Sequence, residues 1–242
     1  MFRTYSPRIA LVVREGRLEG ILYRATMISL TSTRSNLKVA DLMEKPRITC
    51  SERDRPLDIV SKMISMDEWS IPLTGNGNTA LGTVSLESFI NLVYRKLGSN
   101  NLLSSILREH RVDEIMSTSV VSVHSSDTVA GVIRKLLKEK FAGIPVVDDK
   151  NRCVGIITHY DLLSKGYTRV ALESESGPSR EPKVVEVMSS PVDTVYPDSS
   201  IFEVFELMSK KGYGRIPVVD KNKALVGIVD RSDIAGFILK HI

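Results

Sequence analysis

Along this chain, stretches in which apolar residues have helical spacing alternate with stretches typical of buried strands. Between residues 119 and 164, the helix N-cap signal Ser126-Asp127 precedes apolar side chains spaced three and four apart, namely Val129, Val132, Ile133, Leu136 and Leu137. The segments that follow are predicted to form a buried strand, a hairpin turn and a second strand, over Phe141–Val147, Asp148–Asn151 and Cys153–Ile157. With an extended segment in front and a helix from Thr158, the order is strand, helix, strand, strand, helix.

The same pattern occurs three times without gaps, over Met43–Gly82, Met116–Gly155 and Met188–Gly227. In each copy an Ile-Pro pair follows the Met by 28 residues, and the Gly follows that Ile by 11. A partial fourth copy runs from Ile9 to Gly20. The copies start 73 and 72 residues apart, which is longer than a solenoid repeat and close to one small βα domain.

The repeats divide the chain into six predicted segments: a partial repeat 1 (1–35), repeat 2 (36–95), a helical connector (96–111), repeat 3 (112–168), a linker (169–183) and repeat 4 (184–242). A break is expected at 98–101, and the composition of Ser174–Pro182 is typical of a solvated linker. A unit of about 60 residues is marginal alone. We therefore expect two paired modules joined by a structured bridge.

Composition and charge exclude several classes of protein. No apolar run approaches the roughly 20 residues of a membrane-spanning helix, and arginines interrupt the N-terminal segment, so we expect a cytoplasmic protein. Cys50 and Cys153 lack zinc-site spacing and are expected to be reduced packing residues. The net charge is +4, but residues 1–40 alone carry +5. Because the chain has neither a wider basic stripe nor a motif that recognises nucleic acid, a nucleic-acid partner is disfavoured.

Each second strand ends in a Gly-led motif, which in repeat 3 is Gly155-Ile-Ile-Thr158-His-Tyr-Asp161. A hydroxyl and a carboxylate three residues apart lie side by side in the first turn of a helix. One interpretation is a capping box, in which Thr158 and Asp161 satisfy the backbone. The other is a ligand site, in which Asp161 accepts both hydroxyls of a ribose, as acidic residues do in dinucleotide folds. The residues alone leave both open.

Four units of this order, with Ile-Pro-Val-Val eight residues before a Gly-apolar-x-Thr-x-x-Asp motif, resemble the cystathionine β-synthase (CBS) domain family. The resemblance covers nearly the whole chain. It extends to the members of the family that carry four repeats, which are archaeal proteins and proteins that regulate a kinase. It implies an α/β (α+β) fold of tandem βαββα repeats, paired into two Bateman modules. Such modules bind adenosine compounds in clefts, each drawing on two repeats.

Carried over by position, the resemblance implies a first cleft between repeats 3 and 4 made of Ile156, Thr158, Asp161, Val192, Asp193, Tyr213, Gly214 and Arg215. Asp161 would hold the ribose and Arg215 the phosphate. It also implies a weaker second cleft made of Val120, Val121, Ala142, Gly143, Ile228, Asp230 and Asp233. Asp230 replaces the usual hydroxyl there and would repel phosphate, although Arg231 could partly compensate.

Repeats 1 and 2 depart further from the family pattern. Gly82 leads to Ser85 and Ser88 without an acid, and Gly20 leads to Tyr23 and Thr26. The incomplete repeat 1 is expected to leave an apolar face partly uncovered, formed by Ile9, Leu11, Leu18, Ile21 and Ile28. A second subunit would cover it, which predicts a homodimer; a start assigned too far downstream is the competing explanation.

The function predicted from these features is that of a regulatory sensor of AMP, ADP or ATP that acts on an unidentified protein target. No catalytic residues, metal or required cofactor are predicted, because the four histidines form no metal or triad pattern; His159 is taken as an exposed first-turn residue. One alternative is a sensor of S-adenosylmethionine or a related adenosyl ligand, which would not need Arg215. Another is a scaffold with vestigial clefts.

Overall fold

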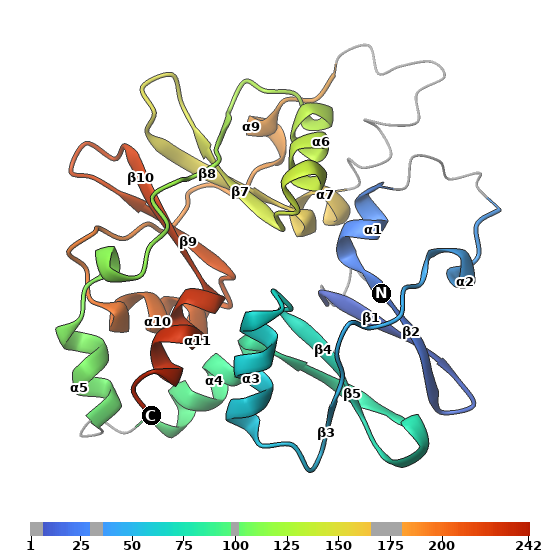
Figure 1. The fold of residues 1–242 in the computed structure, drawn as a ribbon. Helices are drawn as coiled ribbons and strands as arrows, with labels where there is room; N and C mark the ends of the chain where they lie inside the picture. The colour runs from blue at the N-terminus through green and yellow to red at the C-terminus, as the bar shows by residue number, and fades with distance from the viewer. Residues whose placement is uncertain (1–6, 30–35, 98–101, 166–180) are drawn as a thin grey trace. The chain divides into compact units, whose positions relative to one another are not determined.

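The computed structural model describes residues 7–29, 36–97, 102–165 and 181–242 (Figure 1). Repeat 3 contains β6 (Val123–His124), α6 (Val129–Glu139), β7 (Gly143–Val147), β8 (Cys153–Thr158) and α7 (His159–Ser164), after the short helix η2 (Val112–Glu114). Repeat 2 contains β3 (Cys50–Ser51), α3 (Pro56–Ser65), β4 (Ser70–Thr74), η1 (Asn76–Asn78), β5 (Ala80–Ser85) and α4 (Leu86–Lys96). Both show the predicted βαββα order.

The other two repeats are reduced. Repeat 4 contains α9 (Val184–Val187), α10 (Ile201–Lys211), β9 (Arg215–Val219), β10 (Leu225–Asp230) and α11 (Arg231–Leu239), and its opening strand is a single bridge between Val195 and Val218. Repeat 1 contains β1 (Ile9–Arg14), β2 (Arg17–Tyr23) and α1 (Arg24–Ser29). The other helices of the described residues are α2 (Val39–Leu42), at the start of repeat 2, and α5 (Leu102–Glu109), in the connector.

The sheets of repeats 2, 3 and 4 share one register. Within each, the two long strands are antiparallel and the residue after the Gly faces the proline: Thr83 faces Pro72, Ile156 faces Pro145, and Ile228 faces Pro217. Each pairing has a bulge beside the Gly. These are non-hydrogen-bonded pairs of an antiparallel ladder, so the N–H and C=O of the facing residue point away from the proline and are left for another partner.

That partner is the segment that opens another repeat. The backbones of Ile156 and Ser189 exchange N–H···O bonds of 3.0 and 2.8 Å, so the opening segment of repeat 4 lies on the sheet of repeat 3. The opening segment of repeat 3 lies likewise on repeat 4, where Ser117 and Ile228 exchange bonds of 2.9 and 3.0 Å. Repeats 3 and 4 thus exchange their opening segments.

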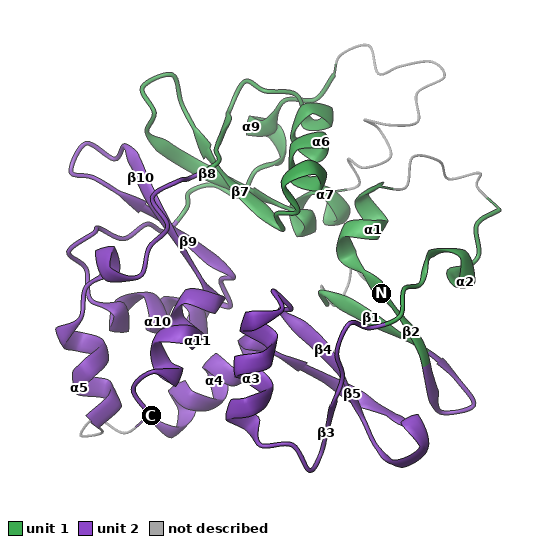
Figure 2. Ribbon diagram, in the orientation of Figure 1, with its two compact units in different colours: residues 1–12, 19–45, 121–192 green, residues 13–18, 46–120, 193–242 purple. Residues whose placement is uncertain are grey.

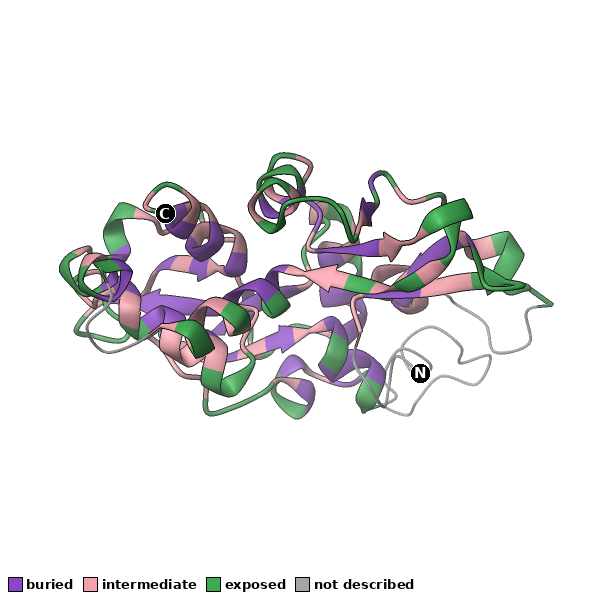
Figure 3. Cartoon of the chain, turned by 90° about the horizontal axis from the view of Figure 1, so that it is seen from below, coloured by how far each residue is buried: buried purple, intermediate pink, exposed green. Residues whose placement is uncertain are grey.

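The chain folds into two compact units (Figure 2): residues 1–12, 19–45 and 121–192 form unit 1, and residues 13–18, 46–120 and 193–242 form unit 2. In unit 1, α1 packs on α6 and α7 around a core that includes Ile28, Ile133 and Leu162. In unit 2, α4 packs on α10 and α11 around a core that includes Phe205. Figure 3 shows the buried residues along the strands and on one side of the longer helices.

Three expectations are corrected. Ile9, Leu18, Ile21 and Ile28 are buried within the chain and Leu11 is half-buried, so most of the apolar face of repeat 1 is covered. Thr128, rather than Ser126-Asp127, caps α6 and accepts a bond from the N–H of Gly131. His159 is buried and not exposed. The predicted break at 98–101 and most of the linker lie outside the described residues.

Other predictions hold. The predicted helical face of α6 is buried at Val129, Val132, Ile133 and Leu136, and both cysteines are free thiols. Within the described part of the chain, every helix is too short or too polar to cross a bilayer.

Candidate functional site

The first turn of α7 in unit 1 is a closed hydrogen-bond network around Asp161. The N–H and the hydroxyl of Thr158 donate to Asp161 Oδ2 at 2.9 and 2.6 Å, and the N–H of Asp161 donates to Thr158 Oγ1 at 3.3 Å. This is the capping box that the sequence allowed. Asp161 is 4% exposed, so its carboxylate depends on these donors.

A third donor reaches Asp161 from the opening segment of repeat 4. The hydroxyl of Ser189 lies 2.6 Å from Asp161 Oδ1, while Thr158 occupies Oδ2. The two oxygens therefore accept one hydroxyl each, which is the arrangement that a vicinal diol would reproduce. Ser189 is not among the residues expected from the sequence, although the alignment of the repeats places it directly after Met188.

Close packing fixes the strands that carry this network. In unit 1 a Cβ added at Gly143 would lie 2.8 Å from Thr158 Cγ2, and one at Gly155 would lie 2.6 Å from Met188 Sδ. Both positions are therefore restricted to glycine. The carbonyl of Ala142 accepts the N–H of His159 at 3.0 Å, and His159 is 5% exposed.

In unit 2, Asp193 is held by two donors from repeat 4. Tyr213 Oη and Lys211 Nζ donate to Asp193 Oδ2 at 2.5 and 2.8 Å. The bond from Lys211, followed by that from Tyr213, lowers the pKa of the Asp193 carboxyl, and the bond to Asp193 together with burial raises the pKa of Tyr213. Asp193 is thus an anchored anion in this structure, and the ring of Tyr213 is fixed beside it.

Arg215 begins β9 and pairs across the strands with Asp230. Its guanidinium lies 5.6 Å from the centre of the Trp69 ring, within cation–π range. Burial lowers its pKa, while Asp230 and Asp233 oppose that shift. The residue predicted to hold phosphate in the first cleft therefore shares unit 2 with the two carboxylates of the second.

Asp230 and Asp233 form the capping box of α11. Asp230 Oδ1 accepts the N–H groups of Ser232 and Asp233 at 2.8 and 3.4 Å, and Asp233 Oδ2 accepts the N–H of Asp230 at 2.7 Å. Burial, followed by the neighbouring Asp230 charge, raises the pKa of Asp233 to about 7. The sequence predicts that the Asp230 charge repels a phosphate. In the structure the same charge already acts on the carboxyl of Asp233, whose pKa it raises.

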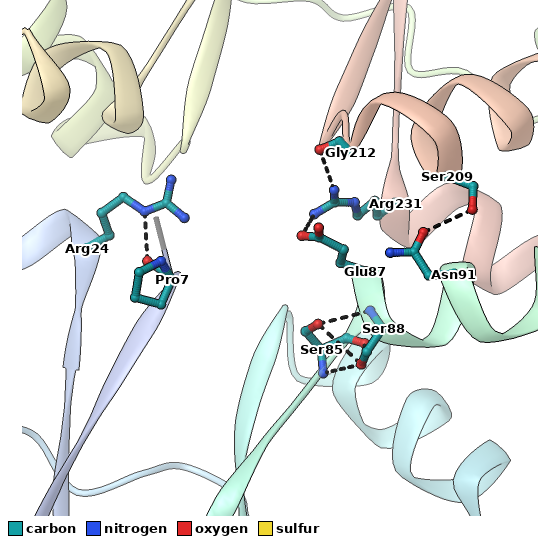
Figure 4. Close-up of polar contacts among 9 residues, drawn as sticks. All are labelled: Pro7, Arg24, Ser85, Glu87, Ser88, Asn91, Ser209, Gly212 and Arg231. Carbon is teal, nitrogen blue, oxygen red and sulfur yellow. Dashed lines mark hydrogen bonds and ion pairs between the residues drawn. The ribbon is translucent and has the colours of Figure 1, made fainter. Parts of the chain in front are cut away.

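Arg231 is not available to compensate for Asp230. It is 3% exposed, and its guanidinium lies between repeats 4 and 2, where Nη1 contacts Glu87 Oε2 at 2.7 Å and Nη2 donates to the carbonyl of Gly212 at 2.6 Å (Figure 4). Beside it, Ser209 Oγ donates to Asn91 Oδ1 at 2.9 Å. Arg231 therefore joins α11 to α4 as a structural residue.

Repeat 2 carries the same first-turn geometry without the carboxylate, and repeat 1 has a different contact at this position. Ser85 and Ser88 cap each other through two backbone-to-hydroxyl bonds of 3.0 Å (Figure 4). In repeat 1, Arg24 Nε donates to the carbonyl of Pro7 at 3.0 Å. Capping is therefore the common function of this position in repeats 2, 3 and 4, and Asp161 and Asp233 add negative charge to it.

The predicted cleft residues divide between the units. Unit 1 contains Ile156, Thr158, Asp161 and Val192 of the first cleft, and Val121, Ala142 and Gly143 of the second. Unit 2 contains Asp193, Tyr213, Gly214 and Arg215 of the first, and Val120, Ile228, Asp230 and Asp233 of the second. Because the two sets belong to separate compact units, their meeting around a ligand stays a prediction.

Among the described residues, no group of His, Cys, Asp and Glu could hold a metal ion.

Comparisons with known proteins agree with this architecture. The family model of the CBS domain matches residues 112–167 and 184–240. The chain superposes on a crystal structure from Methanocaldococcus jannaschii, described as a proposed archaeal homologue of γ-AMPK, with a TM-score of 0.80 and 20% identity, over 98% of this chain and 90% of that one. At that identity the likeness shows the fold.

Two curated relatives are matched in part. Inosine-5′-monophosphate dehydrogenase of M. jannaschii is 29% identical over 60% of this chain and 27% of the enzyme. An uncharacterized protein of Methanopyrus kandleri is 31% identical over 53% of this chain and 62% of its own length. The chain thus spans less than two thirds of either relative, and neither match carries an activity to it.

Proposed function

Since residues 112–167 and 184–240 are CBS domains, we propose that this chain is a regulatory protein that binds an adenine nucleotide, AMP, ADP or ATP, between repeats 3 and 4. The observation that supports this most directly is the Asp161 carboxylate, which accepts one hydroxyl on each oxygen. In the proposed complex the ribose diol replaces Ser189 on Oδ1 and shares the carboxylate with Thr158.

The remaining first-cleft residues take complementary roles in the proposal. Ile156 and Val192 offer apolar contacts to the adenine, while Tyr213 beside Asp193 supplies a fixed ring. Arg215 pairs with the phosphate, which a guanidinium can bind through two parallel hydrogen bonds. Because Asp230 and Asp233 compete for Arg215, each added phosphate has to outweigh that attraction. This favours ligands with more phosphate charge over the bare nucleoside.

The second set of residues supports a different ligand. Asp230 and Asp233 place two carboxyl groups in one turn, so we assign this cleft to a less charged adenosyl ligand or to none. S-Adenosylmethionine is the specific alternative, because its sulfonium is cationic and it needs no phosphate partner. For the first cleft, the same ligand would use Asp161 and leave Arg215 idle.

In this proposal the protein acts through a partner and not as an enzyme, and any conformational response requires a ligand that prefers one of two states. The homodimer was predicted because the apolar residues of repeat 1 were expected to need a covering subunit. Most of these residues are buried within the chain itself, so they no longer support that prediction. Sedimentation of the purified chain, with and without ligand, measures that state directly.

The test is calorimetric titration of the full chain with AMP, ADP, ATP and S-adenosylmethionine. Trp69, the one tryptophan of the chain and a neighbour of Arg215, gives a second readout by fluorescence. Asp161→Asn should weaken every ligand that binds in the first cleft, by about tenfold or more. Arg215→Ala should weaken ATP and ADP more than AMP, and leave S-adenosylmethionine unchanged.

Asp220→Asn is the matched control, since Asp220 caps the exposed turn between β9 and β10 through Asn222 and Ala224. It should leave every affinity unchanged. Absence of binding heat and of a thermal shift with all four compounds would favour the scaffold alternative. An Arg215→Ala effect equal for all ligands would instead contradict the phosphate role and keep the adenosyl site.

A further inference from the structure

Three opening segments share a seven-residue signature: a basic residue, Val, any residue, an acid, an aliphatic residue, Met, and Glu or Ser. They are Lys38–Glu44, Arg111–Ser117 and Lys183–Ser189. The shared order within one chain indicates that each segment meets the same structural demand, in front of repeats 2, 3 and 4.

The three segments also fold alike. The acid accepts the N–H of the basic residue, at 2.8 Å for Asp41, 2.7 Å for Glu114 and 3.1 Å for Glu186. The N–H of each Met then donates to the carbonyl of the Val, at 2.9, 2.9 and 2.8 Å in the same order. Each segment is therefore a single capped turn that presents its methionine.

Each methionine covers the Gly of another repeat. A Cβ added at Gly20, Gly155 or Gly227 would lie 3.1, 2.6 or 2.6 Å from the Sδ of Met43, Met188 or Met116. The residue after the Met pairs in both directions with the residue after the Gly, as Glu44 does with Ile21 at 2.8 and 2.9 Å. The three glycine-bearing strands are thus each covered by an opening segment of the same type, here called a plug.

Repeat 2 has the same glycine-bearing strand, with no plug among the described residues. Gly82 faces Leu73 as Gly155 faces Val146, so the two strands are in the same register. Gly82 has a φ of 157°, unlike Gly155 and Gly227, and nothing described lies within 4 Å of a Cβ added there. The turn between β1 and β2 pairs with Thr79 and Ala80 at the start of β5, but no described segment pairs with Thr83 on its outer side. Leu81 is 46% exposed, whereas its counterparts Val154 and Val226 are partly buried against the cores.

We propose that the outer edge of β5 at Gly82 and Thr83 is a docking site for a segment of this seven-residue type supplied by another polypeptide. The occupant's methionine lies over Gly82, and the next residue exchanges two backbone hydrogen bonds with Thr83. The chemistry of the occupant follows from the three plugs within the chain. All three of the chain's own segments in the described residues are engaged, so a second copy would have to release one to serve as the partner.

The test uses a fluorescein-labelled peptide with the sequence of residues 183–190 and anisotropy measured on the full chain. Saturable binding is expected, and a peptide with Asp in place of the methionine should bind at least about tenfold more weakly. Thr83→Pro removes the outward N–H without removing a bond to Pro72, and should cost a similar factor. Thr83→Val, the matched control, keeps the backbone donor and should bind like the unsubstituted chain.

A second variant guards against misfolding of Thr83→Pro. Leu81→Glu changes an exposed side chain and places a charge beside the end of the peptide, because Ser190 contacts Val154, the counterpart of Leu81, in repeat 3. It should therefore also weaken binding while the melting temperature stays unchanged. Absence of saturable binding would overturn the proposal. So would equal affinity in all variants, which would locate the peptide at Gly155 or Gly227 by exchange. Binding seen only after deletion of residues 1–6 would make the chain itself the occupant, and would also overturn it.

Discussion

The first turns of α7 and α11 are built on the same plan and differ in charge. In both, a cap residue and an aspartate three positions later exchange hydrogen bonds. At α7 the cap is Thr158, whose hydroxyl donates to Asp161. At α11 the cap is Asp230, which can only accept when it is ionised. One substitution of a hydroxyl by a carboxylate therefore turns a donor for the aspartate into a repelling neighbour.

The surroundings enlarge this difference. Ser189 gives Asp161 a second hydroxyl, whereas burial and the charge of Asp230 raise the pKa of Asp233 to about 7 against the opposing charge of Arg215. The residue after the cap is buried in both, as His159 and as Arg231. Capping thus fixes where the aspartate lies, and the neighbours decide how it can be used. The α7 turn suits a diol, and the α11 turn suits a proton or a cationic group.

The largest effect is expected at the position where the two turns differ most in size and charge. Arg231→Ala removes a buried guanidinium that joins Glu87 and the carbonyl of Gly212, so the free energy of unfolding should fall by about 2–4 kcal/mol. Urea denaturation followed by Trp69 fluorescence and circular dichroism measures it.

Glu87→Gln is the control for Arg231. Glu87 is 48% exposed, so its removal should cost about 1 kcal/mol or less, because water screens the pair and the bond to Gly212 remains. Equal losses in both variants would mean that the charge pair, and not the burial of the arginine, joins α11 to α4.

The second prediction concerns pH. A folded-state pKa of about 7 lies above the ordinary aspartate value of 3.8, so the folded chain binds the Asp233 proton more tightly than the unfolded chain does. Its contribution to stability is present below about pH 4 and is lost as the pH rises through 7. Asp233→Asn should therefore become increasingly stabilising relative to the unsubstituted chain between these limits, by at least about 1 kcal/mol.

Asp230→Asn separates the two causes of that shift. It keeps a cap oxygen and removes the neighbouring charge, so the pKa of Asp233, followed by carboxyl ¹³C NMR, should fall while burial keeps it above the value of an exposed aspartate. If Asp233→Asn leaves the pH dependence of stability unchanged, the raised pKa of Asp233 is contradicted.

Local pattern was enough to predict much of this fold. The buried face of α6 and the two strands of repeat 3 follow from apolar spacing, and the turn from Asp148 to Asn151 from its polar residues. The Thr158–Asp161 capping box was one of two interpretations of the same residues, and the structure shows it. These elements could be predicted because a helix face, a strand or a turn depends mainly on residues that are close together in the sequence.

Contacts between repeats could not be predicted in this way. Arg231 and Glu87 are 144 residues apart, and nothing in either local sequence indicates their pairing. The same holds for Ile28, which was expected to be uncovered and is buried because α1 packs on α6 and α7. The repeated opening segments are the exception: their shared signature was visible in the sequence, but its meaning depends on the glycine that each methionine covers.

The smallest effect tests whether the α7 turn is held ready for a diol. Ser189→Ala removes the hydroxyl that occupies Asp161 Oδ1, so a ribose hydroxyl no longer has to displace it, and the affinity for an adenine nucleotide should rise by about two- to tenfold in calorimetry. Ser190→Ala is the matched control, because Ser190 Oγ donates to the carbonyl of Val154 and not to Asp161. Weaker binding in Ser189→Ala alone would mean that Ser189 contacts the ligand instead of giving way to it, since the freed oxygen would otherwise favour the diol.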